Sequence, residues 1–420
     1  MKILFLDQFS ELGGAQQTLL DTVEAVRRKG WQAHVLLPGS GPLIERLQSL
    51  GASISNLPSG PYHSGSKSVA DSIRFALDLQ QQIRAIQAVR ANFDFDLIYA
   101  NGPRLLPAAA LVSRGVAPLV FHAHSHVYGI AAQMLRAGIR SAKPFVIACS
   151  NSVLDPLRRC AETRSLHVIP NGVRDAGYRE RTFGRDGQWR IGIIGRITPD
   201  KGQLEFAGAA AILARDFLLA RFVICGADLD SGYTAYVDAV RERTRGLPVE
   251  YLGWQQDVGP VLRDLDLLVV PSKREGMARI IVEAFSAGVP VVAFPAGGIP
   301  EVIVDGETGF LTQEFSMDAL ASRIRDVLEA PETLGQVASK ARQAWKRLYT
   351  IEAYQGRVIR LLEQSLERST PASPPARQTE VPQPGTWRMP RPVPADSRIA
   401  QASRPKRPLR WLGKRTSPGS

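Results

Sequence analysis

The first 150 residues alternate short apolar runs with longer stretches of helical period. Residues 3–6 form an uninterrupted apolar run, which is typical of a buried strand. Apolar positions then recur at helical spacing over 18–29, and Gly30 ends that helix. Further strands are predicted over 33–37, 97–100, 119–123 and 145–148, and a long amphipathic helix over 72–90. This alternation favours parallel strands joined by crossover helices, the doubly wound α/β class.

The same pattern restarts in the second half of the chain. Residues 174–187 are polar and lack an apolar period, which indicates a linker. Strands are predicted after it over 191–194, 221–225, 249–252, 267–270 and 289–293, and helices over 203–213 and 280–287. We therefore expect two doubly wound, Rossmann-like domains that face a cleft. Ligands of such sheets bind beyond the carboxyl ends of the strands.

Composition adds a basic tail to this picture. The 420 residues are 44% hydrophobic, which is enough apolar sequence for the cores of two or three domains. The net charge is +12, and residues 369–420 carry ten Lys or Arg against two acidic residues. This segment also holds 11 of the 29 prolines, so we expect it to be disordered. Because the remaining body has an ordinary charge balance, a nucleic-acid partner is not expected.

The end of the tail predicts weak contact with a membrane surface. Six cations fall within residues 404–415, interleaved with Leu409, Trp411 and Leu412. Each Lys or Arg near an anionic leaflet contributes roughly 1 kcal/mol, and Trp favours the interface. A tail that only keeps the protein soluble is the alternative interpretation.

Cysteine use and hydropathy point to the cytoplasm. Cys149, Cys160 and Cys225 form no CxxC pair and no disulfide framework. The apolar run at 3–6 is too short for the core of a secretory signal. The uncharged window at 115–135 contains three His, a Pro and two Gly, which argues against a transmembrane helix. A cytoplasmic protein, in peripheral contact with the membrane if its tail binds there, is the resulting expectation.

Two glycine-containing loops follow predicted strands and could approach phosphate. Gly13 and Gly14 lie between the first strand and the first helix, where backbone amides and the helix N-terminus favour an anion. A plain βα turn would also contain such glycines. In the second domain, Arg196 and Lys201 lie in the loop after the strand at 191–194, where a diphosphate would need cations. The alternative there is a solvated basic loop.

The segment 271–284 carries two carboxylates around a predicted helix N-terminus. Glu275 ends a strand loop, and Glu283 lies about two turns into the helix that follows. At this spacing the two carboxylates serve different parts of one ligand. A surface glutamate is the alternative for Glu283, but apolar residues surround it in the sequence and an unpaired buried carboxylate is costly.

Three histidines, His122, His124 and His126, lie at every second position where the strand at 119–123 ends. Alternate residues of an extended segment share one side. A zinc site would need a matching acidic or thiol ligand, and none is evident, so no metal site is predicted. The other alternative is a histidine at the strand end whose hydrogen bonds are satisfied within the fold and which has no functional role.

Taken together, these motifs resemble retaining nucleotide-sugar glycosyltransferases of family 4, which have the GT-B fold. The resemblance covers roughly residues 1–366. It rests on Gly195-Arg196 with Lys201-Gly202, on Glu275 and Glu283 separated by seven residues, and on Gly297-Gly298 followed by Glu301. The segments 150–151, 169–173 and 305–310 are also similar to that family. Arg174 before Asp175 and the step Met277-Ala278 depart from its usual pattern.

The resemblance implies a role for each candidate residue. Arg196 and Lys201 would neutralise the donor diphosphate, and Glu283 would accept hydrogen bonds from the ribose. Glu275 would hold hydroxyls of the donor sugar near the anomeric carbon. His124 would act on the sugar or acceptor side, with His122 and His126 as alternatives. The amides of Gly14, Gly276, Met277 and Ala278 would contact phosphate or sugar oxygens.

The implied activity is a retaining, metal-independent hexosyltransferase. It would move a sugar from a nucleoside-diphosphate sugar, its substrate, to the hydroxyl of a sugar or lipid-linked acceptor, with no cofactor. Surface polysaccharide, lipopolysaccharide or glycolipid assembly is the expected setting. The alternatives are another GT-B activity, an epimerase or a phosphorylase, and a non-catalytic protein that binds sugar nucleotides.

The domain organisation follows from the same reasoning. We expect an acceptor-side domain over 1–173, a linker over 174–187, a nucleotide-sugar-binding domain over 188–345, a helix over 346–368 that returns to the first domain, and the tail over 369–420.

Overall fold

The computed structural model describes residues 1–58, 69–178, 182–228 and 232–367. The basic tail predicted over 369–420 lies outside these residues. Its disorder and its membrane contact therefore stay predictions. In the part of the chain that the structure describes, no helix is both long and apolar enough to span a membrane.

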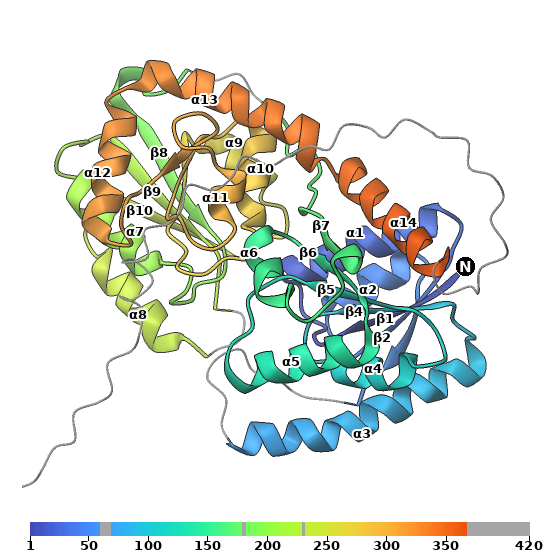
Figure 1. The fold of residues 1–420 in the computed structure, drawn as a ribbon. Coiled ribbons are helices and arrows are strands. Elements are labelled where there is room, and N and C mark those ends of the chain that lie inside the picture. Colours follow the sequence, from blue (N-terminus) through green and yellow to red (C-terminus); the bar gives the residue numbers. More distant parts are fainter. Residues whose placement is uncertain (59–68, 179–181, 229–231, 368–420) are drawn as a thin grey trace, which may run out of the picture. The chain divides into compact units, whose positions relative to one another are not determined.

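Seven parallel strands form the first sheet (Figure 1). Their order across the sheet is β3-β2-β1-β4-β5-β6-β7. The strands are β1 (Lys2–Asp7), β2 (Gln32–Leu37), β3 (Ser53–Asn56), β4 (Leu97–Asn101), β5 (Leu119–Ala123), β6 (Phe145–Ala148) and β7 (Leu166–Val168). Because β1 lies beside β4, the chain reverses its winding direction there, and the carboxyl ends of these two strands meet at the switch point.

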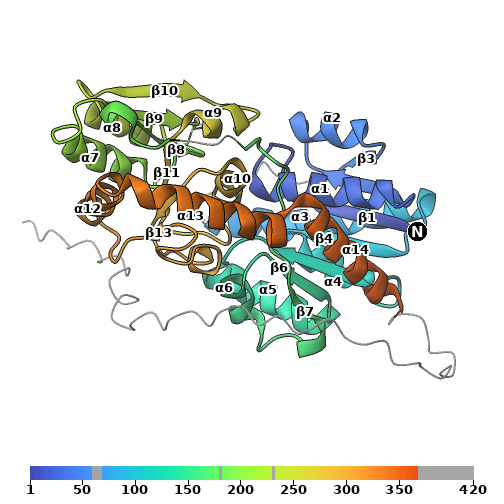
Figure 2. The same cartoon turned by 90° about the horizontal axis from the view of Figure 1, so that it is seen from above.

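Helices cover both faces of this sheet. The alternating residues of β1 divide between two cores, Ile3 and Phe5 on one face and Leu4 and Leu6 on the other. The first face packs against α1 (Gly14–Arg28), α2 (Pro42–Ser49) and α14 (Ile351–Glu367). The second face packs against α3 (Val69–Asn92), α4 (Leu106–Ser113) and α5 (Gly129–Ala142). Figure 1 shows α3, α4 and α5 below the sheet and α14 above it, and in the view from above α14 lies in front (Figure 2). A short helix, α6 (Asn151–Leu154), follows β6.

Six parallel strands form the second sheet, in the order β10-β9-β8-β11-β12-β13. They are β8 (Trp189–Ile194), β9 (Ala220–Cys225), β10 (Val249–Gly253), β11 (Leu267–Val270), β12 (Val291–Ala293) and β13 (Phe310–Leu311). One face packs against α7 (Gln203–Leu213), α8 (Thr234–Arg243) and α12 (Met317–Leu328). The other packs against α9 (Gly259–Asp264), α10 (Arg279–Ala287) and α11 (Ile299–Val302).

The last helices join the two domains. α13 (Pro331–Ala344) packs against α10 of the second domain and continues through a π-helical turn over Trp345–Tyr349. α14 then packs against α1 of the first domain, where the Tyr354 hydroxyl lies 2.7 Å from the Thr22 hydroxyl. The last described residues thus belong to the core of the domain in which the chain begins.

The predicted fold class is confirmed. The short strands β3, β7 and β13 and several helices were not predicted, and some predicted strands begin at a different residue. The sequence pattern predicted a strand from residue 289, but β12 begins at Val291. Gly288 ends α10 with φ +69°, and the Val289 amide donates to the Ala284 carbonyl within that helix end. Pro290 has no amide hydrogen to donate, so it contributes to the ladder only through its carbonyl, which accepts from the Leu268 amide of β11 at 3.0 Å.

Candidate active site

Two loops at the carboxyl ends of neighbouring strands build the centre of the candidate site. The loop after β8 and the loop after β11 are linked where the Lys273 amide donates to the Asp200 carbonyl at 2.8 Å. Gly202 allows this approach. Its φ is +79°, and a Cβ on it would lie 2.2 Å from the Pro271 carbonyl oxygen. Only glycine combines that backbone angle with that contact.

The close approach of the loops pairs Lys201 with Glu275. The Lys201 ammonium donates to Glu275 Oε1 at 2.5 Å, and the Glu275 side chain is 10% exposed. Both residues were predicted to contact different parts of one ligand, and the structure brings their charged ends into contact. A cation and an acceptor oxygen are therefore available side by side at the end of β11.

Arg196 lies in the same loop, and a side chain from α7 binds its main-chain carbonyl. The Gln203 side chain, at the start of α7, donates to the Arg196 carbonyl at 2.7 Å and accepts from the Thr198 amide at 3.3 Å. This side chain fixes the loop that carries Arg196 and Lys201. A fixed loop holds cations in place at a lower entropic cost than a mobile one.

The segment after Glu275 touches the first domain. A Cβ on Gly276 would lie 2.1 Å from the His124 carbonyl oxygen, so only glycine fits at position 276. The Ser150 hydroxyl donates to the Gly276 carbonyl at 2.7 Å. The Asn171 amide contacts the buried sulfur of Met277 at 3.2 Å. The backbone of His124 is thereby placed next to the Glu275–Gly276 peptide.

A buried ion cluster lies at the N-terminus of α10. Arg279 donates to Asp21 of α1 at 3.0 Å and to Glu283, one turn further along α10, at 3.1 Å. Burial raises the pKa of both carboxyl groups, and the Arg279 charge opposes that rise. Asp21 and Glu283 in turn raise the pKa of Arg279. Glu283, predicted to bind ribose, is thus held by an arginine that also bonds the first domain.

We expect Arg279→Met to lower the free energy of unfolding by about 3 kcal/mol near neutral pH, because it leaves two carboxylates without their cation. A buried acid with a raised pKa favours folding at low pH and loses that contribution as pH rises through the raised value. The loss should therefore be larger at about pH 8 than at about pH 5. Urea unfolding at both pH values measures it.

The control for this prediction is the exposed pair between Arg325 and Asp216, 2.6 Å apart. Arg325→Met should cost at most about 1 kcal/mol, since solvent screens such pairs. If Arg279→Met costs no more than Arg325→Met, the buried cluster contributes nothing to stability beyond an ordinary surface pair.

The side chain of His124 is tied to the first sheet through Asn101 and Asp7. His124 Nε2 lies 2.7 Å from Asn101 Oδ1, and Asn101 Nδ2 donates to Asp7 Oδ2 at 2.5 Å. Burial lowers the pKa of His124 to about 3, so its ring is neutral at physiological pH. Burial also raises the pKa of Asp7 to about 6, against the effect of the hydrogen bonds that it accepts.

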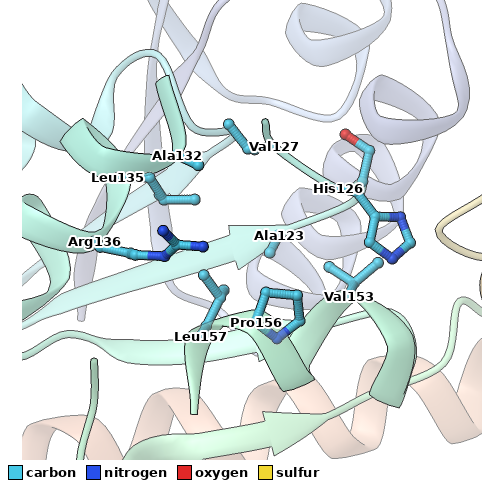
Figure 3. A pocket seen from close by; sticks show the side chains of 10 residues that line it. Ala123, His126, Val127, Ala132, Leu135, Arg136, Val153, Pro156 and Leu157 are labelled. Carbon is cyan, nitrogen blue, oxygen red and sulfur yellow. The ribbon is translucent and has the colours of Figure 1, made fainter. Parts of the chain in front are cut away.

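The other two histidines have different surroundings. His122 is fully buried, with Nδ1 2.6 Å from the Tyr99 hydroxyl, and burial lowers its pKa. His126 lies 3.0 Å from the Ser152 carbonyl and lines a small pocket of the first domain. Figure 3 shows His126 at one end of that pocket and Arg136 at the other. Among the described residues, no three His, Cys, Asp or Glu side chains are grouped as metal ligands.

The remaining candidates are main-chain groups at helix N-termini. Gly14 is the first residue of α1, and Ala278 precedes the first residue of α10. Neither helix has an acidic residue in its first turn. Their free amides are therefore suited to receive an anion.

Three residues of this region were not predicted from the sequence: Asp7, Asn101 and Asp21. Asp7 and Asn101 each directly follow a predicted strand of the first sheet, a signal that could have placed them at the carboxyl edge. Asp21 lies among the apolar residues of the first helix, which could have marked it as a buried carboxylate. The hydrogen bonds that Glu301 accepts from the amides of Asn151 and Ser152, each at 2.7 Å, were not predicted either.

Two family models match the chain. The model described as Glycosyltransferase Family 4 matches residues 12–176, and the model described as Glycosyl transferases group 1 matches residues 188–330. Together the two matched ranges contain both sheets except β1, which lies before residue 12.

Proteins of similar sequence and a solved structure of similar fold agree with these matches. The chain is 34% identical to a D-inositol 3-phosphate glycosyltransferase of Corynebacterium glutamicum, over 34% of this chain and 36% of the relative. A protein of the same description from Mycolicibacterium gilvum is 25% identical over 82% of this chain and 84% of the relative. The solved structure of Anabaena Alr3699/HepE in complex with UDP-glucose is 25% identical, with a TM-score of 0.73, over 87% of this chain and all of that one.

Proposed function

The chain belongs to the glycosyltransferases of family 4 type with the GT-B fold, and from this premise we propose that it uses a nucleoside-diphosphate sugar. It would transfer the sugar to an acceptor hydroxyl with retention of the anomeric configuration. The observation that carries the proposal is the contact between Lys201 and Glu275 beside the His124 backbone. A cation for a phosphate, an acceptor for sugar hydroxyls and a group of the opposite domain lie together there.

The proposed roles follow from charge and position. Arg196 and Lys201 balance the charge that develops on the leaving diphosphate, and no metal ion is needed for that role. Glu275 accepts hydrogen bonds from the donor sugar. Its contact with the Lys201 ammonium supports this, because a sugar linked to the diphosphate must lie next to the cations, and the next residue, Gly276, lies against the His124 carbonyl.

The main-chain and ribose contacts complete the donor site. The amides of Gly14 and of Gly276, Met277 and Ala278 donate to phosphate or sugar oxygens. Glu283 accepts from the ribose hydroxyls while Arg279 holds its other side. The complexes of the Anabaena relative with UDP and with UDP-glucose support a nucleotide sugar as donor.

Surface polysaccharide or glycolipid assembly is the setting that we propose for this transfer. The support is the resemblance to family 4, whose members include assembly enzymes of this kind. The family favours glycosyl transfer over an epimerase, a phosphorylase or a non-catalytic binding protein, which were the alternatives.

A panel of donors tests the proposal. UDP, GDP and ADP sugars are added to the full chain, and thermal unfolding is recorded with and without EDTA. We expect one nucleotide to stabilise the protein by roughly 2.7 kcal/mol at 100 times its dissociation constant. Transfer from the matching sugar should be unchanged by EDTA, and NMR of the first product should show the donor's own anomeric configuration.

The outcomes separate the parts of the proposal. No stabilisation by any nucleotide or nucleotide sugar would contradict a donor site. An inverted product would contradict retention alone. Loss of activity in EDTA that Mg²⁺ restores would contradict the metal-independent mechanism while leaving glycosyl transfer intact.

A further inference from the structure

Three polar residues lie in a row across the carboxyl edge of the first sheet. The register of the parallel strands places Asp7 of β1 beside Asn101 of β4, and Asn101 beside His122 of β5. His124 follows β5 and reaches back to Asn101. The order of the hydrogen-bonded chain is therefore Asp7, Asn101, His124, with the last residue next to the Glu275–Gly276 peptide.

The direction of each hydrogen bond in this chain is set at Asp7. Asp7 Oδ1 accepts from the Phe9 amide at 2.9 Å and from Gln16 Nε2 at 2.9 Å. A backbone amide can only donate, and an ionised carboxylate can only accept. The other oxygen, Oδ2, therefore requires a donor, and the amide nitrogen of Asn101 supplies it at 2.5 Å.

The orientation of Asn101 then determines the state of His124. Asn101 Nδ2 also lies 3.3 Å from the Ala15 carbonyl, a second acceptor, so its nitrogen cannot exchange places with its oxygen without losing both bonds. Asn101 Oδ1 consequently faces His124 Nε2 at 2.7 Å and needs a hydrogen from it. A neutral imidazole that carries its proton on Nε2 has a free lone pair on Nδ1.

That second nitrogen is buried and unused. Nδ1 of His124 has no hydrogen-bond partner among the residues that the structure describes. A buried polar atom without a partner costs free energy unless a ligand forms a hydrogen bond with it. As an acceptor it suits a hydroxyl group and not a second acceptor such as a phosphate oxygen.

We propose that Asp7 and Asn101 are positioning residues that hold His124 in the Nε2–H tautomer, so that its Nδ1 accepts a hydrogen bond from a hydroxyl of the substrate. The proposal rests on the proposed function in placing a sugar beside His124. Its core, the tautomer and its cause, concerns the protein without substrate and can be measured without any activity.

The test is ¹⁵N NMR of the full chain labelled at histidine, at about pH 8, where Asp7 is ionised. Protonated and unprotonated ring nitrogens resonate in separate ranges, and a His124→Gln variant identifies the signals of His124. We expect the proton on Nε2 in the unchanged protein. A proton on Nδ1, or equal populations of the two tautomers, would overturn the proposal.

Asp7→Asn gives a sharper test because it changes one acceptor into a donor at constant size. The Phe9 amide and Gln16 keep the oxygen of the new side chain, so its NH₂ group faces Asn101. Asn101 must then turn its oxygen toward residue 7 and its nitrogen toward His124. We expect the proton of His124 to move to Nδ1, whereas an unchanged tautomer would contradict the proposed chain.

Asp96→Asn is the matched control. Asp96 accepts from the Lys2 amide at the opposite end of the same pair of strands, so it should leave the His124 signals unchanged. A shift of the same kind in this variant would show that the spectra respond to general changes in the sheet, and would overturn the assignment to Asp7.

Kinetics connects the tautomer to the reaction. Asp7→Asn should lower kcat by about tenfold or more with the KM for the donor changed less than threefold, since it alters one proton position and no donor cation. If the tautomer moves and kcat does not, the substrate role of Nδ1 is wrong while the positioning chain stands. If the unchanged protein shows the Nε2–H tautomer but no transfer from any nucleotide sugar, only the proposed function fails.

Discussion

Glu275→Ala is expected to reduce transfer by a factor on the order of 10² or more at saturating donor, with the fold intact. Glu275 is 10% exposed, and its carboxylate contacts only Lys201 among the hydrogen bonds and ion pairs of the described side chains. The Glu275 carbonyl, which accepts from the Gly298 amide, belongs to the main chain and is kept in the variant. The carboxylate therefore contributes little to the fold apart from its contact with Lys201.

The affinity of Glu275→Ala for the nucleoside diphosphate should not fall together with its rate of transfer. Removing the carboxylate frees the Lys201 ammonium from its partner at 2.5 Å, which leaves more positive charge for a diphosphate. We expect the affinity for the free nucleoside diphosphate to be unchanged or higher in Glu275→Ala. Turnover, calorimetric titration with the nucleoside diphosphate and circular dichroism together measure the three expectations.

Glu275→Gln separates two explanations of such a loss. Glutamine keeps the size of the side chain and can still accept a hydrogen bond, but it carries no charge. If Glu275 acts on sugar hydroxyls only through hydrogen bonds, the glutamine variant should recover part of the activity. A Glu275→Ala enzyme that keeps most of its kcat would show that this carboxylate has no part in the transfer.

The strands of both sheets could be predicted from sequence because buried parallel strands are short apolar runs. The predicted strands at 119–123, 145–148 and 267–270 have the bounds of β5, β6 and β11. Strands with few apolar residues gave no such signal. β3 (Ser53–Asn56) has three polar residues among its four and is partly exposed at the edge of its sheet, and β13 has two residues, so neither was predicted.

The loop residues of the candidate site could be selected from sequence because strand ends collect functional groups in this fold class. Their partners could not. Asp21 and Arg279 are 258 positions apart, and Asn151 and Glu301 are 150 apart, so no spacing in the sequence connects them. The same holds for Lys201 and Glu275, whose contact depends on the absence of a side chain at Gly202.

Arg196→Ala and Lys201→Ala form the second prediction with a large effect. Each should weaken donor binding and lower kcat/KM by a factor on the order of 10². Each variant removes a cation proposed to balance the negative charge that develops on the leaving diphosphate. The structure adds a difference between them. Lys201→Ala also leaves Glu275 without its ion-pair partner, whereas Arg196→Ala leaves that pair in place.

The double variant of Lys201 and Glu275 follows from this difference. If the lysine acted only by holding Glu275, removing both side chains would cost no more than removing Glu275 alone. If Lys201 also contacts the diphosphate, the double variant should bind the nucleoside diphosphate more weakly than Glu275→Ala does. Calorimetric titration of the single and double variants with the nucleoside diphosphate measures the contact without turnover.

Lys273→Ala provides the control for a change of charge in the same region. Lys273 lies two residues before Glu275, but its ammonium pairs with Glu205 at 2.6 Å and is half exposed. Its removal should leave kcat/KM within about threefold, because solvent screens such a pair. If Lys273→Ala and Lys201→Ala reduce kcat/KM equally, the general positive charge of the loops explains the effect. A specific contact of Lys201 with the diphosphate would then be refuted, since two cations with different partners would have acted alike.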